Sequence, residues 1–173
     1  MGDVYLTRDD LAARVHELGA EISGDYADGD LVLVAMLRGA VVFATDLARA
    51  ITIPHAMDFV ALAGYGGRPA GGPVARLMKD LDEPIESRDV LLVDNVVDTG
   101  LTLNYLLKTF TLRNPASLAV CTLLDRPYRR LCDDLPIRYV GFTVPDEFFV
   151  GYGFELDGRH RCLPDLRVAR TRR

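Results

Sequence analysis

The chain has 173 residues, of which 49% are hydrophobic and 26% charged, and its formal net charge at pH 7 is −5. This length suits one domain with a single hydrophobic core, and the composition is that of a globular protein. The acidic balance argues against a surface built mainly for nucleic-acid phosphates, and no apolar run approaches the ~20 residues that a membrane-spanning helix needs.

The cysteines and histidines predict neither a disulfide framework nor a metal site. Cys121, Cys132 and Cys162 are an odd number, and their spacing fits no zinc motif. The three histidines lie far apart in the sequence, and the polar, acidic N-terminus lacks the features of a secretory signal. We therefore expect a cytoplasmic protein with reduced thiols that binds neither nucleic acid nor membranes.

The predicted elements alternate between helices and strands. Residues 7–23 begin with Thr7 as a helix cap and then repeat apolar residues at intervals of three and four, which predicts an amphipathic helix. In chain order there follow a buried strand (31–36), a helix (40–51), a strand (57–62), a return strand (74–80), a buried strand (89–93), a helix (101–113) and two strands (117–124 and 137–142). The segment 64–73, GYGGRPAGGP, is too rich in glycine and proline for a regular element and is predicted to be a loop or hairpin tip.

This alternation predicts an α/β fold around a parallel sheet of about four or five strands. The tail from Val144 onward carries little helix signal. Ligands of such sheets bind at the carboxyl ends of the strands. We therefore expect the polar loops at 37–39, 94–100 and 125–127 to lie together at one edge of the sheet.

The segment 89–102, DVLLVDNVVDTGLT, carries the strongest functional pattern. If the strand ends at Val93 and the helix begins near Leu101, the residues just before the helix offer free backbone N–H groups and the positive end of the helix dipole, a combination that binds phosphate. Asp94 and Asn95 can accept hydrogen bonds from hydroxyl groups or reach a cation beside a phosphate.

A simpler alternative is that Asp98 or Thr99 only caps the helix. Capping does not explain Asp94 and Asn95, which stand where a buried strand would still be apolar. Two other phosphate-binding patterns are absent from the sequence, namely GxxxxGK[ST] and a GxGxxG that opens a helix after a strand.

The same segment resembles the signature of type I phosphoribosyltransferases, in which two acidic residues follow a hydrophobic strand and precede the pattern D-T/S-G-x-T. The stretches VAMLRGA, RLMKDLD, CTLLDRP and VPDEFFVGYG are similar, in the same order, to those of bacterial hypoxanthine-guanine phosphoribosyltransferases, so the resemblance covers about residues 5–166. It implies the type I phosphoribosyltransferase fold, a mostly parallel sheet flanked by helices with a flexible Gly-rich catalytic loop. The whole chain, 1–173, would be one domain with a core over about 25–143 and a small hood from the N-terminal region and about 144–173.

The resemblance also implies an activity. Such enzymes transfer the 5-phosphoribosyl group of phosphoribosyl pyrophosphate to N9 of a 6-oxopurine and release pyrophosphate, with Mg²⁺ as the cofactor. The small-molecule partners would be phosphoribosyl pyrophosphate and a 6-oxopurine, and the chain would form a homodimer or homotetramer. The alternative from another class of function is a sensor or regulator with this fold and weak or altered catalysis.

The resemblance assigns roles to residues at matching positions. Those that would bind phosphoribosyl pyrophosphate are Leu37, Arg38, Gly39, Asp94, Asn95, Asp98, Thr99, Gly100, Leu101, Thr102 and Arg161. Asp98 would also be the general acid or base near purine N7, and Tyr65 would close over the reaction centre. The purine would be bound by Arg126, Phe148, Phe149 and Val150, with Phe148 stacking on its ring, and the metal would contact Asp94 and Glu155.

Four positions depart from the family pattern. Asn95 replaces an acidic residue, Arg126 a lysine, Glu155 an aspartate and Gly64 a serine. The amide at Asn95 removes a negative charge, and a guanidinium at Arg126 is bulkier and more rigid than an ammonium group. The hypothesis that follows is an altered base preference or a reduced turnover on a conserved phosphate site.

Overall fold

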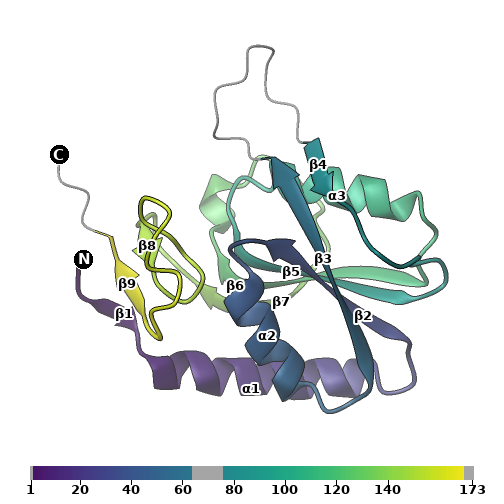
Figure 1. Ribbon diagram of the computed structural model, residues 1–173, viewed down its shortest axis with the longest axis horizontal. Helices are drawn as coiled ribbons and strands as arrows, with labels where there is room; N and C mark the ends of the chain where they lie inside the picture. The colour runs from purple at the N-terminus through teal and green to yellow at the C-terminus, as the bar shows by residue number, and fades with distance from the viewer. Residues whose placement is uncertain (1, 64–75, 170–173) are drawn as a thin grey trace.

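The computed structural model describes residues 2–63 and 76–169 of the chain (Figure 1). Gly64 and Tyr65 lie outside the described residues, so the role expected of Tyr65 stays a prediction. Within the described ranges, two sheets and three α-helices make up the fold.

The larger sheet has six strands in the order β4-β3-β2-β5-β6-β7 (Figure 1). Their bounds are Arg76–Lys79 (β4), His55–Ala63 (β3), Leu31–Leu37 (β2), Asp89–Val97 (β5), Ser117–Asp125 (β6) and Ile137–Thr143 (β7). Five of them, from β3 to β7, run parallel, and β4 pairs antiparallel with β3 at one edge. This confirms the predicted α/β fold with a mostly parallel sheet.

Helices cover both faces of this sheet. They are α1 (Arg8–Asp25), α2 (Val41–Ala50) and α3 (Leu101–Thr111), with a short 3-10 helix η1 (Pro127–Arg129) after β6. Buried residues of α1 and α2 share one core cluster with strand residues such as Leu33, and those of α3 share a second cluster with neighbours such as Val34. Because side chains alternate along a strand, the continuous apolar run of β2 supplies both cores.

The start of α1 follows the predicted capping pattern. Thr7 is the N-cap, and its hydroxyl accepts a hydrogen bond of 3.1 Å from the backbone N–H of Asp10. The carboxylate of Asp10 accepts one of 2.9 Å in return from the backbone N–H of Thr7. This reciprocal arrangement satisfies two backbone donors that the helix leaves free at its start.

The predicted end of the strand 89–93 at Val93 is wrong, because this strand, β5, continues to Val97. The additional residues pair with β6, where Asp94 lies opposite Thr122 and Val97 opposite Asp125. A central strand with a long partner on one side gains backbone hydrogen bonds by continuing, even through polar side chains. Asp94 and Asn95 therefore lie within the strand and not in the loop after it.

A second sheet of three strands lies beside the start of α1 (Figure 1). Its order is β1-β9-β8, with bounds Val4–Leu6 (β1), Leu166–Val168 (β9) and Phe149–Val150 (β8). All pairs in it are antiparallel, so the sheet joins the N-terminal and C-terminal parts of the described chain. This sheet brings the segment after Val144 to the ligand-binding edge expected for the larger sheet.

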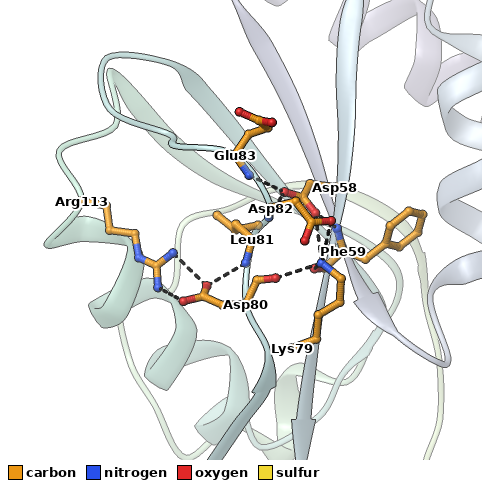
Figure 2. A network of polar contacts seen from close by, with 8 residues as sticks. All are labelled: Asp58, Phe59, Lys79, Asp80, Leu81, Asp82, Glu83 and Arg113. Atoms are coloured by element: carbon orange, nitrogen blue, oxygen red, sulfur yellow. Dashed lines mark hydrogen bonds and ion pairs between the residues drawn. The ribbon is translucent and has the colours of Figure 1, made fainter.

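A polar network fastens β4 to the edge of the larger sheet (Figure 2). Asp58 of β3 is 8% exposed, and its carboxylate accepts hydrogen bonds from three backbone N–H groups. The ammonium group of Lys79 lies 3.4 Å from Asp58 Oδ1 and donates to two backbone carbonyls. Burial by itself would raise the pKa of Asp58, but these N–H groups and Lys79 outweigh it and lower that pKa. Arg113, near the end of α3, forms two hydrogen bonds with Asp80 and so ties the network to the helix.

Among the described residues, no helix is long and apolar enough to cross a membrane. Cys121, Cys132 and Cys162 are free thiols in this part of the chain. Cys121, a residue of β6, is fully buried in the core that the larger sheet shares with α1 and α2. The burial of Cys121 agrees with its place in the apolar run SLAVCTLL.

Candidate active site

The carboxyl ends of the parallel strands bring several predicted site residues together. A pocket of about 170 Å³ lies between the end of β2 and the connection from β5 to α3. Its lining residues are Met36, Asp94, Val96, Val97, Asp98, Thr99, Gly100, Thr102 and Leu103. The structure therefore places Asp94 in the same pocket as the residues at the start of α3.

The start of α3 is open to an anion. Its N-cap is Gly100, in the left-handed region with φ +81°, and no side chain forms a cap hydrogen bond. A Cβ at Gly100 would also collide with Leu135, so this backbone conformation requires glycine. The alternative that Asp98 or Thr99 simply caps the helix is therefore wrong; the Thr99 hydroxyl reaches the N–H of Leu101 only at 3.5 Å. The first N–H groups of the helix have no intrahelical acceptor and suit a phosphate.

Asp94 is half-buried within β5, and Oδ1 accepts a hydrogen bond of 2.8 Å from the backbone N–H of Asn95. Burial raises the pKa of Asp94 to about 7, while the N–H groups of Asn95 and Val96 oppose the rise. A carboxyl group with such a pKa changes its charge near neutral pH. A cation or a hydroxyl donor that reaches this carboxyl group would stabilise its ionised form.

Asn95 packs against the loop that follows β2. A Cβ at Gly39 would lie 2.6 Å from Asn95 Nδ2 and 2.8 Å from Oδ1, so the approach of the two segments depends on a glycine. The peptide bond between Leu37 and Arg38 in this loop is cis. On its other side, the carbonyl of Gly39 contacts Gly153, where a Cβ would overlap it. The loop 37–39 is thus held between β5 and the C-terminal part of the described chain.

Arg161 and Glu155 meet at the same place. Arg161 Nη1 donates a hydrogen bond of 2.6 Å to the carbonyl of Gly153, and Nη2 lies 3.4 Å from Glu155 Oε2. Since Gly153 contacts Gly39, these two side chains lie beside the loop 37–39. Among the described residues, no three His, Cys, Asp or Glu side chains gather as a metal site. Mg²⁺ needs no such cluster, because it is commonly held by one or two carboxylates together with substrate phosphates and water.

Asp98 carries the other predicted function, and two arginines face it. Arg129 Nε lies 3.0 Å from Asp98 Oδ1, and Arg126 Nη1 lies 3.9 Å from Oδ2. Oδ1 is buried and has no hydrogen bond within the described part of the chain, since Arg129 is close but not aligned to donate. This oxygen is therefore a buried acceptor without a hydrogen bond among the described residues.

Arg126 is 9% exposed and is held in place by the segment that leads into β8. Nη2 donates to the carbonyl of Glu147, and the guanidinium lies over the ring of Phe149 at 5.7 Å from its centre. Nε is buried without a hydrogen bond to any described residue. Arg126 and Asp98 therefore each keep one buried polar atom without a hydrogen bond in the described part of the chain.

The three residues expected around the purine differ in exposure. The side chain of Phe148 is 73% exposed, so its ring is free to stack on a flat ligand. Phe149 and Val150 are buried in β8, and the Phe149 ring packs on Tyr5 at 4.9 Å between centres. The side chains of these two residues are therefore enclosed by the protein, and their role in purine binding stays a prediction.

Two residues of the site were not identified from the sequence, namely Arg129 and Gly153. Arg129 pairs with Asp98 and also donates a hydrogen bond of 2.9 Å to Asp146 Oδ1. In the sequence it is one of several arginines after β6, and nothing local distinguishes it. The pattern GYG at 151–153 was a possible signal for a tight backbone approach.

Comparison with known proteins adds independent information. The family model described as "Phosphoribosyl transferase domain" matches residues 3–157. The chain is 48% identical over 166 residues to a hypoxanthine-guanine phosphoribosyltransferase of Mycobacterium avium, covering 92% of this chain and 81% of that protein. It is 43% identical over 164 residues to a hypoxanthine phosphoribosyltransferase of Salmonella typhimurium, covering 94% and 92%. A crystal structure of a hypoxanthine-guanine phosphoribosyltransferase from Bacillus anthracis is similar with a TM-score of 0.88 and 38% identity, covering 96% of each chain.

Proposed function

The chain belongs to the phosphoribosyl transferase domain family, and we propose that it transfers the 5-phosphoribosyl group of phosphoribosyl pyrophosphate to N9 of a 6-oxopurine. The products are a purine nucleoside monophosphate and pyrophosphate, so the reaction is one of purine salvage. One observation carries the choice of base: Arg126 Nη1 and Asp98 Oδ2 lie 3.9 Å apart, and each of these two side chains also keeps a buried polar atom, Arg126 Nε and Asp98 Oδ1, without a hydrogen bond among the described residues.

The arrangement of these two groups suits a 6-oxopurine. In the N7–H tautomer of such a base, the N7–H donor lies beside the O6 acceptor on one edge of the ring. Asp98 would accept from N7–H and Arg126 would donate to O6. Adenine carries an amino group in place of O6 and would set donor against donor at Arg126. A buried donor left without a partner is costly, which supports discrimination against adenine.

The ribose phosphate would bind at the start of α3. Residues 98–102 supply free N–H groups around the glycine cap, and the hydroxyls of Thr99 and Thr102 line the same pocket. Asp94 and Asn95 lie in β5 just before this phosphate site and would accept hydrogen bonds from the ribose hydroxyls. Asp98 connects this site with Arg126, because it lines the pocket and its Oδ2 lies 3.9 Å from Arg126 Nη1.

In the reaction, the bond from purine N9 to the ribose C1′ forms as the bond from C1′ to the pyrophosphate oxygen breaks. Asp98 would take the proton from N7 as positive charge develops on the purine ring. The leaving pyrophosphate would be received by the loop 37–39 and by Arg161, which lie together around Gly153. Exposed Phe148 would stack on the purine and hold its plane.

Mg²⁺ is the proposed cofactor, and Asp94 and Glu155 would hold it. When bound with the substrate, such an ion neutralises charge on the pyrophosphate. The pKa of about 7 at Asp94 means that a cation and the proton compete for this carboxylate near neutral pH.

Two further properties concern the assembly of the chain and its location. The resemblance to the family supports a homodimer or homotetramer, which light scattering coupled to gel filtration measures directly. The free thiols of Cys132 and Cys162, of which Cys162 is exposed, suit the reducing environment of the cytoplasm.

The test is purine-dependent release of pyrophosphate from phosphoribosyl pyrophosphate and Mg²⁺, measured in turn with hypoxanthine, guanine, xanthine and adenine. We expect turnover with a 6-oxopurine, none above background with adenine, and a large fall in turnover, to a low but measurable rate, in Asp98→Asn. Equal turnover with adenine would contradict the argument from Arg126. Tight binding of phosphoribosyl pyrophosphate with no turnover on any purine would favour a sensor instead. If hypoxanthine and guanine are both used at full rate, the changes at Asn95, Arg126 and Glu155 alter neither base preference nor turnover.

A further inference from the structure

Arg129 joins two carboxylates that lie far apart in the sequence. It is the last residue of η1, and its Nε lies 3.0 Å from Oδ1 of Asp98, the first residue after β5. Its Nη1 donates a hydrogen bond of 2.9 Å to Asp146 Oδ1, in the segment that leads to Phe148. One guanidinium thus connects the proposed acid–base residue with the segment proposed to hold the purine.

These contacts are poorly placed to stabilise the fold. The side chain of Arg129 is 39% exposed and that of Asp146 is 62% exposed, and ion pairs at such exposure add little to the stability of a fold because water screens them. The guanidinium is a rigid planar fork, so the contact with Asp146 Oδ1 keeps Nε close to the Asp98 carboxylate, as an ion pair and not as a hydrogen bond. The geometry is therefore better suited to orienting Asp98 than to holding the chain together.

Asp98 depends on such a contact, because other groups leave its carboxylate loosely held. Oδ1 has no hydrogen bond within the described residues, and Arg126 approaches Oδ2 only to 3.9 Å. Arg126 is itself committed to the carbonyl of Glu147 and to the ring of Phe149. Of the two arginines that face Asp98, Arg129 is the nearer, and its second contact, with Asp146, keeps it there.

We propose that Arg129 is a positioning residue, which holds the carboxylate of Asp98 in the orientation needed for proton transfer and ties that orientation to the purine segment through Asp146. The proposal rests on the function proposed above, and it assigns Arg129 no contact with either substrate. Displacement of a catalytic group by about 1 Å costs up to about 100-fold in rate. Loss of Arg129 should therefore lower kcat while leaving the phosphate site intact.

The experiment is a double-mutant cycle on kcat, with KM for phosphoribosyl pyrophosphate measured in every variant. Arg129→Met removes the charge and keeps the side-chain bulk, and it is made both in the wild type and in Asp98→Asn. Arg88→Met is the matched control, since Arg88 also pairs through Nε, at 2.8 Å from Asp30, at the opposite ends of the strands. Circular dichroism and thermal melting establish that each variant is folded.

We expect Arg129→Met to lower kcat by about 10- to 100-fold in the wild type, with KM for phosphoribosyl pyrophosphate changed by less than about twofold. In Asp98→Asn the same substitution should cost less than about twofold, because its effect passes through the missing carboxylate. Arg88→Met should leave kcat unchanged. An equal loss from Arg129→Met in both backgrounds overturns the proposal, as does a rise in KM without a fall in kcat.

Two further variants keep the test decisive if Arg129→Met folds poorly. Arg129→Lys retains the charge but has a single donor group in place of the fork, so it should restore part of the rate lost in Arg129→Met. Asp146→Asn should lower kcat by less than Arg129→Met, because it removes the anchor and leaves the contact with Asp98. Wild-type rates in both variants overturn the proposal. An inactive wild-type enzyme would instead count against the proposed function, so the two failures are distinguishable.

Discussion

Replacing Asp94 by asparagine should stabilise the substrate-free protein at neutral and alkaline pH. Burial raises the pKa of Asp94 from its ordinary value of 3.8 to about 7, so the folded protein resists ionisation of this group. A carboxyl group with a raised folded pKa contributes stability that is complete below about pH 4 and is lost as the pH rises through about 7. Asparagine keeps an acceptor for the N–H of Asn95 and carries no charge.

The size of the effect follows from the two pKa values. Raising the pKa from 3.8 to about 7 corresponds to about 4 kcal/mol of lost stability once the carboxylate is fully ionised. Of this loss, about 2–3 kcal/mol develops between about pH 5 and pH 8. These are upper values, because Asp94 is half-buried and water relaxes around its charge.

The assay is urea unfolding at pH 5 and at pH 8, without substrate or Mg²⁺, for the wild type, Asp94→Asn and the control Asp133→Asn. Asp133 is exposed in the loop before β7, so its substitution should change the free energy of unfolding by less than about 0.5 kcal/mol at either pH. The stability gain of Asp94→Asn over the wild type should grow with pH, while its turnover should fall because a proposed metal ligand is lost. A gain that is equal at the two pH values, or that shrinks as the pH rises, would refute the reasoning.

Three other substitutions test the site and its support. Arg126→Lys restores the residue of the family pattern. Because an ammonium group is smaller than a guanidinium and cannot lie flat over the Phe149 ring, KM for hypoxanthine and guanine should change by at least about threefold, while KM for phosphoribosyl pyrophosphate should not change. The measurement is steady-state kinetics with both substrates varied, and an unchanged purine KM would show that Arg126 does not reach the base. Gly39→Ala places a Cβ 2.6 Å from the Asn95 amide and should raise KM for phosphoribosyl pyrophosphate by about tenfold. The control is Gly24→Ala on α1, whose Cβ meets open space; it should leave this KM unchanged and leave the stability of the fold equal or higher. If Gly39→Ala binds phosphoribosyl pyrophosphate normally, the contact between the loop and β5 does not matter for that substrate. Lys79→Met leaves buried Asp58 without its cation and should lower the free energy of unfolding in urea titrations by more than the control Lys108→Met, on the exposed face of α3. Equal effects of the two lysine substitutions would show that the network in Figure 2 adds little.

The sequence by itself determined the three α-helices and the order of the strands in the chain between them, and it predicted an anion site at the start of α3, because all of these depend on short-range patterns. The capping box at Thr7 and the spacing of apolar residues define α1 with only neighbouring residues involved. The apolar run of β2 already indicates burial on both faces, which only helices on each side of a parallel sheet provide. The anion site at the start of α3 follows from a glycine cap and free N–H groups within five consecutive residues.

Tertiary structure decided the points at which distant segments meet. The extension of β5 through Asp94 and Asn95 follows from pairing with β6, which a pattern of polar side chains cannot reveal. The raised pKa of Asp94 follows from the neighbours that bury it, and the contacts of Gly39 with Asn95 and Gly153 join three segments. Arg129 received no role from the sequence because its two carboxylates come from segments about 30 and 17 residues away, and only the parallel sheet brings their ends to one edge.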